Sequence, residues 1–219
     1  MIPYKRPGKT RVGGSMERVL LGRANSSNVM KVIWLLEELG LPYQRHDVGG
    51  RFGAPPGYAD QNPNNLIPTL IEDGWVLWES NAILRYLGTT NPTAAWPTDP
   101  QARAVVDQWM DWQQTVLGRP QTTVFQGLVR QTPAQRDDAA IAQAVTELGK
   151  HYGLLDRQLA GQDWVAGPGF TLADVALGVH AHRWFSFALS RPELPHLQRW
   201  YDRLLGRPAY VRHVALPMT

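Results

Sequence analysis

The sequence contains no cysteine among its 219 residues. This absence excludes disulfide bonds, thiolate metal ligands and an enzyme thiol as nucleophile. Any sulfur chemistry therefore needs a thiol that a ligand brings with it. The absence is also consistent with an intracellular protein, and we expect a cytoplasmic location.

The sequence also lacks any apolar run of about 18 residues, the length expected of a membrane-spanning helix. Acidic residues are missing from residues 1–15, which instead contain Lys5, Arg6, Lys9 and Arg11. Without these four, the formal net charge of +3 becomes 3 − 4 = −1. Because the rest of the chain is nearly neutral, we expect a disordered basic tail over residues 1–15 and neither nucleic acid nor membrane as a partner.

The most informative stretch, residues 64–87, begins with Ile67-Pro68 and two short strand patterns. Residues 69–71 and 75–78 are typical of strands, and Asp73-Gly74 between them is a two-residue turn that antiparallel hairpins favour. Proline donates no backbone hydrogen bond and is the residue at which cis peptide bonds occur. We therefore expect the backbone N–H and C=O of Ile67 to face outward.

Glu79 and Ser80 follow the hairpin at the start of a predicted helix, with Ser80 as its N-cap. A helix N-terminus attracts a carboxylate, and the Glu79 carboxylate beside it would attract an ammonium group. The two together suit an amino-acid head group, while the open edge at Ile67 suits an extended peptide. These residues indicate a small acidic peptide as ligand.

The combination of Ile67-Pro68, a hairpin and Glu79-Ser80 resembles the glutathione site of the glutathione transferases, and the resemblance covers about residues 17–214. It implies that Ile67, before a cis Pro68, pairs through its backbone with the cysteinyl unit. It also implies that Glu79 and Ser80 hold the γ-glutamyl end. The simpler alternative is an ordinary hairpin and helix of an α/β domain.

Four polar residues, Asn25 to Asn28, separate a predicted strand over 18–22 from a predicted helix. Any of them could simply cap that helix. The resemblance implies that a hydroxyl here donates a hydrogen bond to the glutathione sulfur, and it places Ser26 in this role, with Ser27 as the nearest rival. In one bacterial class a residue two positions later shares the work, which points to Asn28.

Residues 49–65 are rich in glycine and proline and are predicted to form a loop. The family often uses a basic residue of this loop for the glycyl carboxylate, and Arg51 is the only cation in it. The alternative is that Arg51 is a solvated surface residue. Many relatives carry a polar residue just before the apolar-proline pair, where this chain has Leu66. Two outcomes are open: glutathione binding is weaker than in those relatives, or Asn64 and Arg51 compensate. We expect Asn65 to adopt a left-handed conformation.

The order of the predicted elements indicates two domains. A second strand over 43–48 would run parallel to the first, because crossover connections are right-handed, and strand-helix-strand followed by hairpin and helix is the thioredoxin-like order. We therefore predict an α/β plus all-α protein, in which an N-terminal thioredoxin-like domain is followed by a C-terminal helical bundle domain. The predicted bounds are 16–90 for the first domain, 91–100 for a linker and 101–219 for the second domain.

Apolar stripes define the helices of the second domain. The helix that carries the stripe from Val105 to Val116 is predicted to end at Pro120. Thr132-Pro133 is predicted to start the next helix. Thr171 and Asp174 form the pattern of a reciprocal cap before a buried helix, so their role is in folding.

Two histidines and an arginine lie near the end of that predicted helix. His180 and His182 are two positions apart, which points them away from each other and argues against a shared metal, so we expect no metal site. Arg183 could reach the glutathione sulfur from the second domain or form a structural ion pair. Trp109, Trp112, Trp184 and Phe185 could line an apolar pocket or belong to the core.

The sequence thus predicts a glutathione transferase that conjugates the glutathione thiolate to small apolar electrophiles, in detoxification and as a homodimer. Two alternatives remain open: a glutathione-dependent reductase of disulfides or peroxides with the same site, and a non-catalytic protein that binds glutathione. Leu66 favours the binding protein, whereas Ser26, Glu79 and Ser80 favour catalysis.

Overall fold

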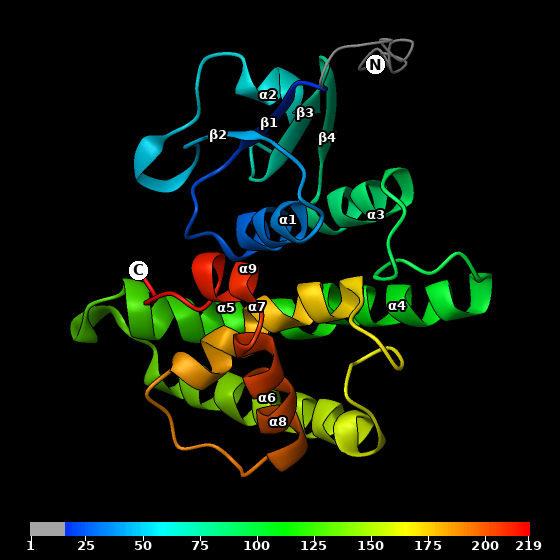
Figure 1. Ribbon diagram of the computed structural model, residues 1–219. Helices are drawn as coiled ribbons and strands as arrows, with labels where there is room; N and C mark the ends of the chain where they lie inside the picture. Colours follow the sequence, from blue (N-terminus) through cyan, green and yellow to red (C-terminus); the bar gives the residue numbers. More distant parts are fainter. Residues whose placement is uncertain (1–15) are drawn as a thin grey trace. The chain divides into compact units, whose positions relative to one another are not determined.

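The computed structural model describes residues 16–219, so the predicted basic tail lies outside the described residues. The chain divides into two compact units, with the boundary between Leu87 and Gly88. The N-terminal unit contains a β-sheet with helices, and the described elements of the C-terminal unit are helical (Figure 1). This is the predicted order of an α/β domain followed by an all-helical domain.

The sheet of the N-terminal unit has four strands in the order β2-β1-β3-β4. Their bounds are β1 Arg18–Leu21, β2 Gln44–His46, β3 Thr69–Glu72 and β4 Trp75–Trp78. As predicted, β2 runs parallel to β1, and β3 and β4 form an antiparallel hairpin. The turn residues Asp73 and Gly74 have φ values of 45° and 83°, as a type I′ turn requires.

The helical segments of this unit are α1 Ser27–Glu38, η1 Gly50–Phe52, α2 Tyr58–Gln61 and the first part of α3 Ser80–Thr90, which continues past the unit boundary. In Figure 1, α1 and α3 lie along one side of the sheet, and α2 lies on the other side. Every residue of α1 from Val29 to Leu36 is buried. Burial in the middle of this helix therefore extends beyond the single apolar stripe that the sequence indicates.

The C-terminal unit is organised around α7. Its elements are α4 Pro100–Trp112, η2 Gln113–Leu117, α5 Gly118–Phe125, η3 Gln126–Arg130, η4 Pro133–Gln135, α6 Asp138–Gln158, η5 Leu159–Gly161, α7 Leu172–Ser186, α8 Pro195–Leu205 and α9 Pro208–His213. The first ten residues of α7 are all buried, and the helix contacts α4, α5 and α8. Trp184 and Trp200 are among the largest fully buried side chains, so they belong to the core of this unit.

The predicted reciprocal cap of α7 is confirmed. Asp174 accepts hydrogen bonds from the Thr171 amide at 2.8 Å and the Val165 amide at 3.0 Å, and also from Trp200 Nε1 at 2.9 Å. Burial raises the pKa of Asp174, while these hydrogen bonds lower it. The carboxylate thus joins the start of α7 to the preceding loop and to α8.

The prediction that Pro120 ends a helix is wrong. Helical structure continues through α4, η2, α5 and η3, from Pro100 to Arg130. In a regular α-helix the proline ring would collide with the carbonyl of residue 116. Residue 116 lies in η2, which is a π-helical turn. The wider geometry of this turn accommodates the ring of Pro120 within the helical run.

The predicted start of the next helix at Thr132 is also wrong. Thr132 forms a capping box with Gln135 on the short η4, whereas α6 begins at Asp138. The carboxylate of Asp137 accepts a hydrogen bond from the Ala140 amide at 2.9 Å. This aspartate therefore provides the cap of the long helix.

Candidate active site

Ser26 is the N-cap of α1, with extended backbone angles of φ −85° and ψ 127°. Its carbonyl accepts the first hydrogen bond of the helix, from the Met30 amide at 2.8 Å, but its side chain makes no capping hydrogen bond. Ser26 is 8% exposed, Ser27 is half-buried, and Asn28 is exposed. The Ser26 hydroxyl therefore lies at the helix N-terminus without being used as a cap.

The Ile67-Pro68 peptide bond is cis, as expected. Within residues 16–219, the Ile67 amide and carbonyl take part in no loop or turn hydrogen bond, so this edge can pair with an extended ligand. Gly22 places the edge next to α1, because a Cβ on Gly22 would lie 2.5 Å from Val29 Cγ2 and 3.4 Å from Ile67 Cβ. The first turn of α1 and the Ile67 edge are thus neighbours.

A cluster of buried polar side chains holds the backbone next to the Ile67 edge. The Tyr58 hydroxyl donates to the Leu66 carbonyl at 2.6 Å and lies 2.9 Å from Thr69 Oγ1. Asn62 Nδ2 also donates to the Leu66 carbonyl, at 2.8 Å. Since Tyr58, Asn62 and Thr69 are all buried, these bonds fix the backbone on both sides of Ile67.

The start of α3 differs from the prediction by one residue. The helix begins at Ser80, and the carbonyl of Glu79 accepts a hydrogen bond from the Ile83 amide at 2.9 Å, so Glu79 and not Ser80 is the N-cap. Glu79 has a φ of 72°, which lets one residue turn the end of β4 into the helix. A non-glycine residue in this conformation is often found at a functional site.

Ser80 and Asn28 bring two of the predicted subsites together. The Ser80 hydroxyl is buried and lies 3.3 Å from Asn28 Oδ1, to which it donates. The predicted γ-glutamyl subsite at α3 is therefore joined directly to the predicted thiol subsite at α1. Glu79 is exposed beside them, so its carboxylate is accessible to a ligand.

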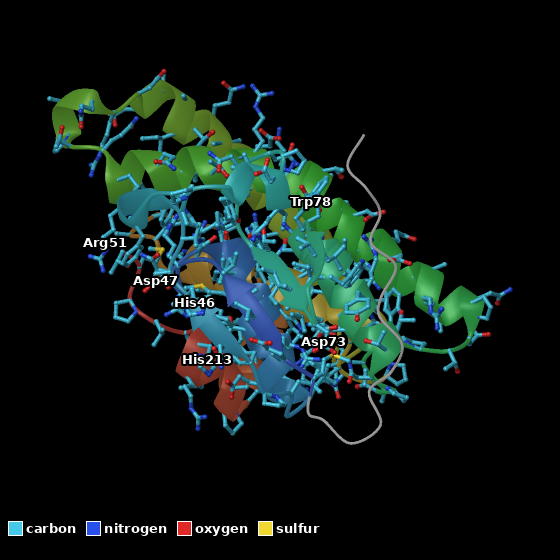
Figure 2. The ribbon with its side chains drawn as sticks, turned by 90° about the horizontal axis from the view of Figure 1, so that it is seen from above. His46, Asp47, Arg51, Asp73, Trp78 and His213 are labelled. Carbon is cyan, nitrogen blue, oxygen red and sulfur yellow. The ribbon has the colours of Figure 1, made fainter. Side chains whose placement is uncertain are left out.

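Arg51 lies on η1, on the loop that follows β2. In Figure 2, Arg51 lies to the left of Asp47 and His46. Its guanidinium lies 4.8 Å from the centre of the Phe52 ring, and the side chain is exposed. The loop starts against the Ile67 edge, since a Cβ on Gly49 would lie 3.1 Å from Ile67 Cδ1.

The residues just before Ile67 behave partly as expected. Asn65 has a φ of 53°, the predicted left-handed conformation, and Leu66 is 64% exposed. Asn64 is exposed, and its amide donates to Asn62 Oδ1 at 3.1 Å. The Asn64 backbone is thus tied to Asn62, and its side chain is exposed beside the edge.

Two cations near the site were not predicted: Arg23, which precedes α1 and lies against this loop, and the buried Lys31. A Cβ on Gly50 would lie 3.0 Å from Arg23 Nε, so Arg23 accompanies Arg51 there. Lys31 lies inside α1 and donates to Asn81 Oδ1 at 2.9 Å. One signal pointed to Lys31: it is a single charge within the otherwise apolar run from Val29 to Leu36.

The other predicted candidates lie in the C-terminal unit. The Arg183 guanidinium lies 4.1 Å from the centre of the Phe125 ring. His180 pairs with Gln113 at 2.9 Å, and His182 pairs with Tyr201 at 2.9 Å. Among residues 16–219 there is no group of three His, Cys, Asp or Glu residues that could hold a metal ion. Over the same range, no helix has the length and apolar character needed to cross a membrane.

Comparisons with known proteins identify the family. The models of the glutathione S-transferase N-terminal and C-terminal domains match residues 25–90 and 138–203. Glutathione S-transferase GstB of Escherichia coli (strain K12) is 39% identical over 205 residues, which are 91% of this chain and 99% of GstB. The chain belongs to the glutathione S-transferase family.

Two further relatives refine this picture. The crystal structure of the theta class glutathione S-transferase from the citrus canker pathogen Xanthomonas axonopodis pv. citri, with glutathione bound, has a TM-score of 0.89 and 44% identity, and the match covers 92% of this chain and 99% of that one. The disulfide-bond oxidoreductase YfcG of Escherichia coli (strain K12) is 30% identical over 199 residues, which are 85% of this chain and 89% of YfcG. The comparisons confirm the predicted family, fold class and assignment as a glutathione transferase.

Proposed function

We propose that this glutathione transferase binds the tripeptide along the Ile67 edge and the start of α3, and that Ser26 stabilises its thiolate for attack on a small apolar electrophile. One observation carries the proposal: the Ser80–Asn28 hydrogen bond of 3.3 Å joins the start of α3 to the first turn of α1, which Ser26 caps without using its hydroxyl. A tripeptide whose head group lies at Ser80 can therefore place its sulfur near Ser26.

The energy that Ser26 must supply is within the reach of one hydroxyl. A free thiol with a pKa of about 8.5 is about 3% ionised at pH 7, and lowering the pKa by about 2 units takes about 2.7 kcal/mol. A hydrogen bond to a charged group contributes about 1.5 to 3 kcal/mol, and the N-terminus of α1 adds up to about 1 kcal/mol. Ser26 therefore acts as a hydrogen-bond donor and needs no general base.

Ionisation alone gives only a modest rate gain. A thiolate with a lower pKa is a weaker nucleophile, so the net acceleration from ionisation is about threefold. Most of the acceleration must then come from holding the electrophile against the sulfur. Ser26 contributes to this too, because its hydrogen bond fixes the direction of the thiolate.

The remaining roles follow the chemistry of the ligand. The Glu79 carboxylate pairs with the γ-glutamyl ammonium group, and the N-terminus of α3 with Ser80 holds the adjacent carboxylate. The Ile67 backbone pairs with the cysteinyl unit, and Arg51 and Asn64 hold the glycyl end. Ser27 is the alternative donor to the sulfur, and Asn28 shares this work with Ser26.

A second function uses the same site for disulfide reduction, and the similarity to YfcG favours it. The bound thiolate attacks one sulfur of a disulfide, which forms a mixed disulfide and releases the other sulfur as a thiolate. A second glutathione then resolves the mixed disulfide, so oxidised glutathione leaves and the substrate is fully reduced. The chain has no cysteine, so glutathione supplies both electrons.

The decisive experiment measures glutathione turnover with a chloro-nitro aromatic and with a small disulfide, for wild type, Ser26→Ala and Ser27→Ala. We expect a loss of tenfold or more in Ser26→Ala alone. The preferred acceptor distinguishes conjugation from reduction. Glutathione binding without turnover of either acceptor would replace catalysis by the non-catalytic binding function.

The homodimer, the cytoplasmic location and the contribution of Arg183 are also proposals. Glutathione transferases are usually dimers, and that resemblance supports a dimer here. Light scattering at micromolar protein concentration tests the dimer. Arg183→Ala tests the arginine, because an effect on turnover without a change in the melting temperature would support contact with the substrate.

A further inference from the structure

Lys31 is a buried charge at the junction of α1 and α3. Its side chain is 1% exposed, and its ammonium group donates a hydrogen bond to Asn81 Oδ1, which is itself on a residue only 1% exposed. Burying an ammonium group is costly unless it is hydrogen-bonded. A lysine at this position of α1 therefore calls for a specific role.

Two charged residues influence Lys31, and one of them, Glu79, belongs to the candidate site. Burial is the main influence and lowers the pKa of Lys31 from 10.5 to about 7. Glu79, at the entry to α3, raises this pKa, and Arg85, further along α3, lowers it. The charge of Lys31 is therefore linked to the carboxylate that we assign to the ligand's ammonium group.

Lys31 forms the second of two hydrogen bonds between the same helix segments. Asn28 and Lys31 are three positions apart and lie on one face of α1. Their partners, Ser80 and Asn81, are the first two residues of α3. The two bonds together fix the N-terminus of α3 against the first turns of α1, more firmly than either bond alone.

We propose that Lys31 is a positioning residue for glutathione, which through Asn81 and the charge of Glu79 holds the N-terminus of α3 at the distance from Ser26 that the tripeptide spans. Lys31 does not touch the ligand. Its effect reaches the ligand through Glu79 and Ser80, the residues that hold the γ-glutamyl end. The inference rests on the glutathione site proposed above.

The test separates binding of glutathione from the chemical step. We expect Lys31→Met to raise the KM for glutathione about tenfold, the effect of one hydrogen bond to a charged group. The kcat at saturating glutathione and the KM for the electrophile should change less than twofold. An unchanged KM for glutathione would overturn the proposal. Lys150→Met, the same replacement on the exposed surface of α6, is the control and should change none of these constants.

A second variant keeps the test decisive if Lys31→Met does not fold. Asn81→Ala removes the same hydrogen bond from the side of α3 and should raise the KM for glutathione similarly. The double variant should show no further rise, because both changes break one connection. If the fold increase in the KM of the double variant equals the product of the two single fold increases, the two residues act independently and the proposal is overturned.

Calorimetry with glutathione alone distinguishes failure of the positioning role from failure of the proposed function. If wild type binds glutathione but turns over no acceptor, the proposed catalysis is contradicted. A tenfold higher dissociation constant of Lys31→Met for glutathione would still support the positioning role. An equal dissociation constant would overturn positioning alone. No binding by wild type would overturn both.

Discussion

Ser80 donates a hydrogen bond to Asn28 at 3.3 Å, although the two residues are 52 positions apart in the chain. The predicted role of Asn28 is to share the work of Ser26 at the sulfur. Because its side-chain oxygen accepts this bond from the start of α3, we infer a second role in the proposed subsite for the γ-glutamyl end.

Replacement of Asn28 should therefore weaken binding more than catalysis. We expect Asn28→Ala to raise the KM for glutathione three- to tenfold, the loss of about 0.5 to 1.5 kcal/mol for one neutral hydrogen bond, with a smaller effect on kcat. Steady-state kinetics with varied glutathione measures both constants. Gln143→Ala, on the exposed surface of α6, is the control. A fall in kcat at constant KM in Asn28→Ala would assign Asn28 to the sulfur instead.

Glu79→Gln should separate the charge of this side chain from its shape. The side chain is exposed, so we expect the melting temperature to stay within about 2 °C of wild type, as for most surface replacements. The KM for glutathione should rise about tenfold, because the ammonium group loses a charged partner. Glu147→Gln, on the exposed face of α6, should leave both quantities unchanged. Equal KM values for the two variants would exclude Glu79 from the site.

Tyr58→Phe should loosen the backbone beside Ile67. The variant loses the 2.6 Å hydrogen bond to the Leu66 carbonyl, which keeps its bond from Asn62. We expect a loss of about 1 to 2 kcal/mol in the free energy of unfolding and a rise of about threefold in the KM for glutathione. Denaturant unfolding and steady-state kinetics measure the two effects. Tyr43→Phe, which removes a 3.2 Å bond to Glu37, should change stability by less and leave KM unchanged.

Asp174→Ala should be among the most destabilising single replacements in the C-terminal unit. The buried carboxylate accepts hydrogen bonds from two backbone amides and from Trp200, and all of these donors would lose their partner. We expect a loss of about 3 to 5 kcal/mol in the free energy of unfolding. Asp137→Ala, which removes the exposed cap of α6, should cost about 1 kcal/mol. Similar losses for the two variants would contradict the burial argument.

Lys31 should make the stability of the protein depend on alkaline pH. Its pKa is about 7 in the folded protein and 10.5 as the ordinary value. Between these values the unfolded chain binds more protons than the folded one, so the free energy of unfolding rises with pH. The cost of burying the charge is thus present in full below pH 7 and disappears as the pH approaches about 10.5, the ordinary pKa of lysine.

Denaturant unfolding at pH 6, 8 and 10 measures this contribution. Relative to Lys31→Met, wild type should gain a few kcal/mol of stability from pH 6 to pH 10, as expected from the shifted pKa. Wild type and Lys150→Met should instead remain parallel, because Lys150 is exposed. A constant difference between wild type and Lys31→Met at all three pH values would contradict the prediction.

The sequence by itself determined the elements whose causes are local. The Asp73-Gly74 turn is specified by two residues that adopt positive φ, and the cap of α7 by Thr171 and Asp174. The same holds for the order of strands and helices that indicated a thioredoxin-like domain followed by a helical one. Where two local signals competed, as at Pro120 and at Thr132, the sequence alone led to wrong helix boundaries, because packing and a stronger cap decided the outcome.

Only the tertiary structure decided which residues of the site meet. Asn28 and Ser80, and Lys31 and Asn81, are about fifty positions apart, so no local pattern pairs them. The left-handed conformation of Glu79, which moves the cap of α3 from Ser80 to Glu79, also depends on how β4 joins α3. The burial of Lys31 is likewise a property of the fold, and the removal of water from its ammonium group is the main cause of its lowered pKa.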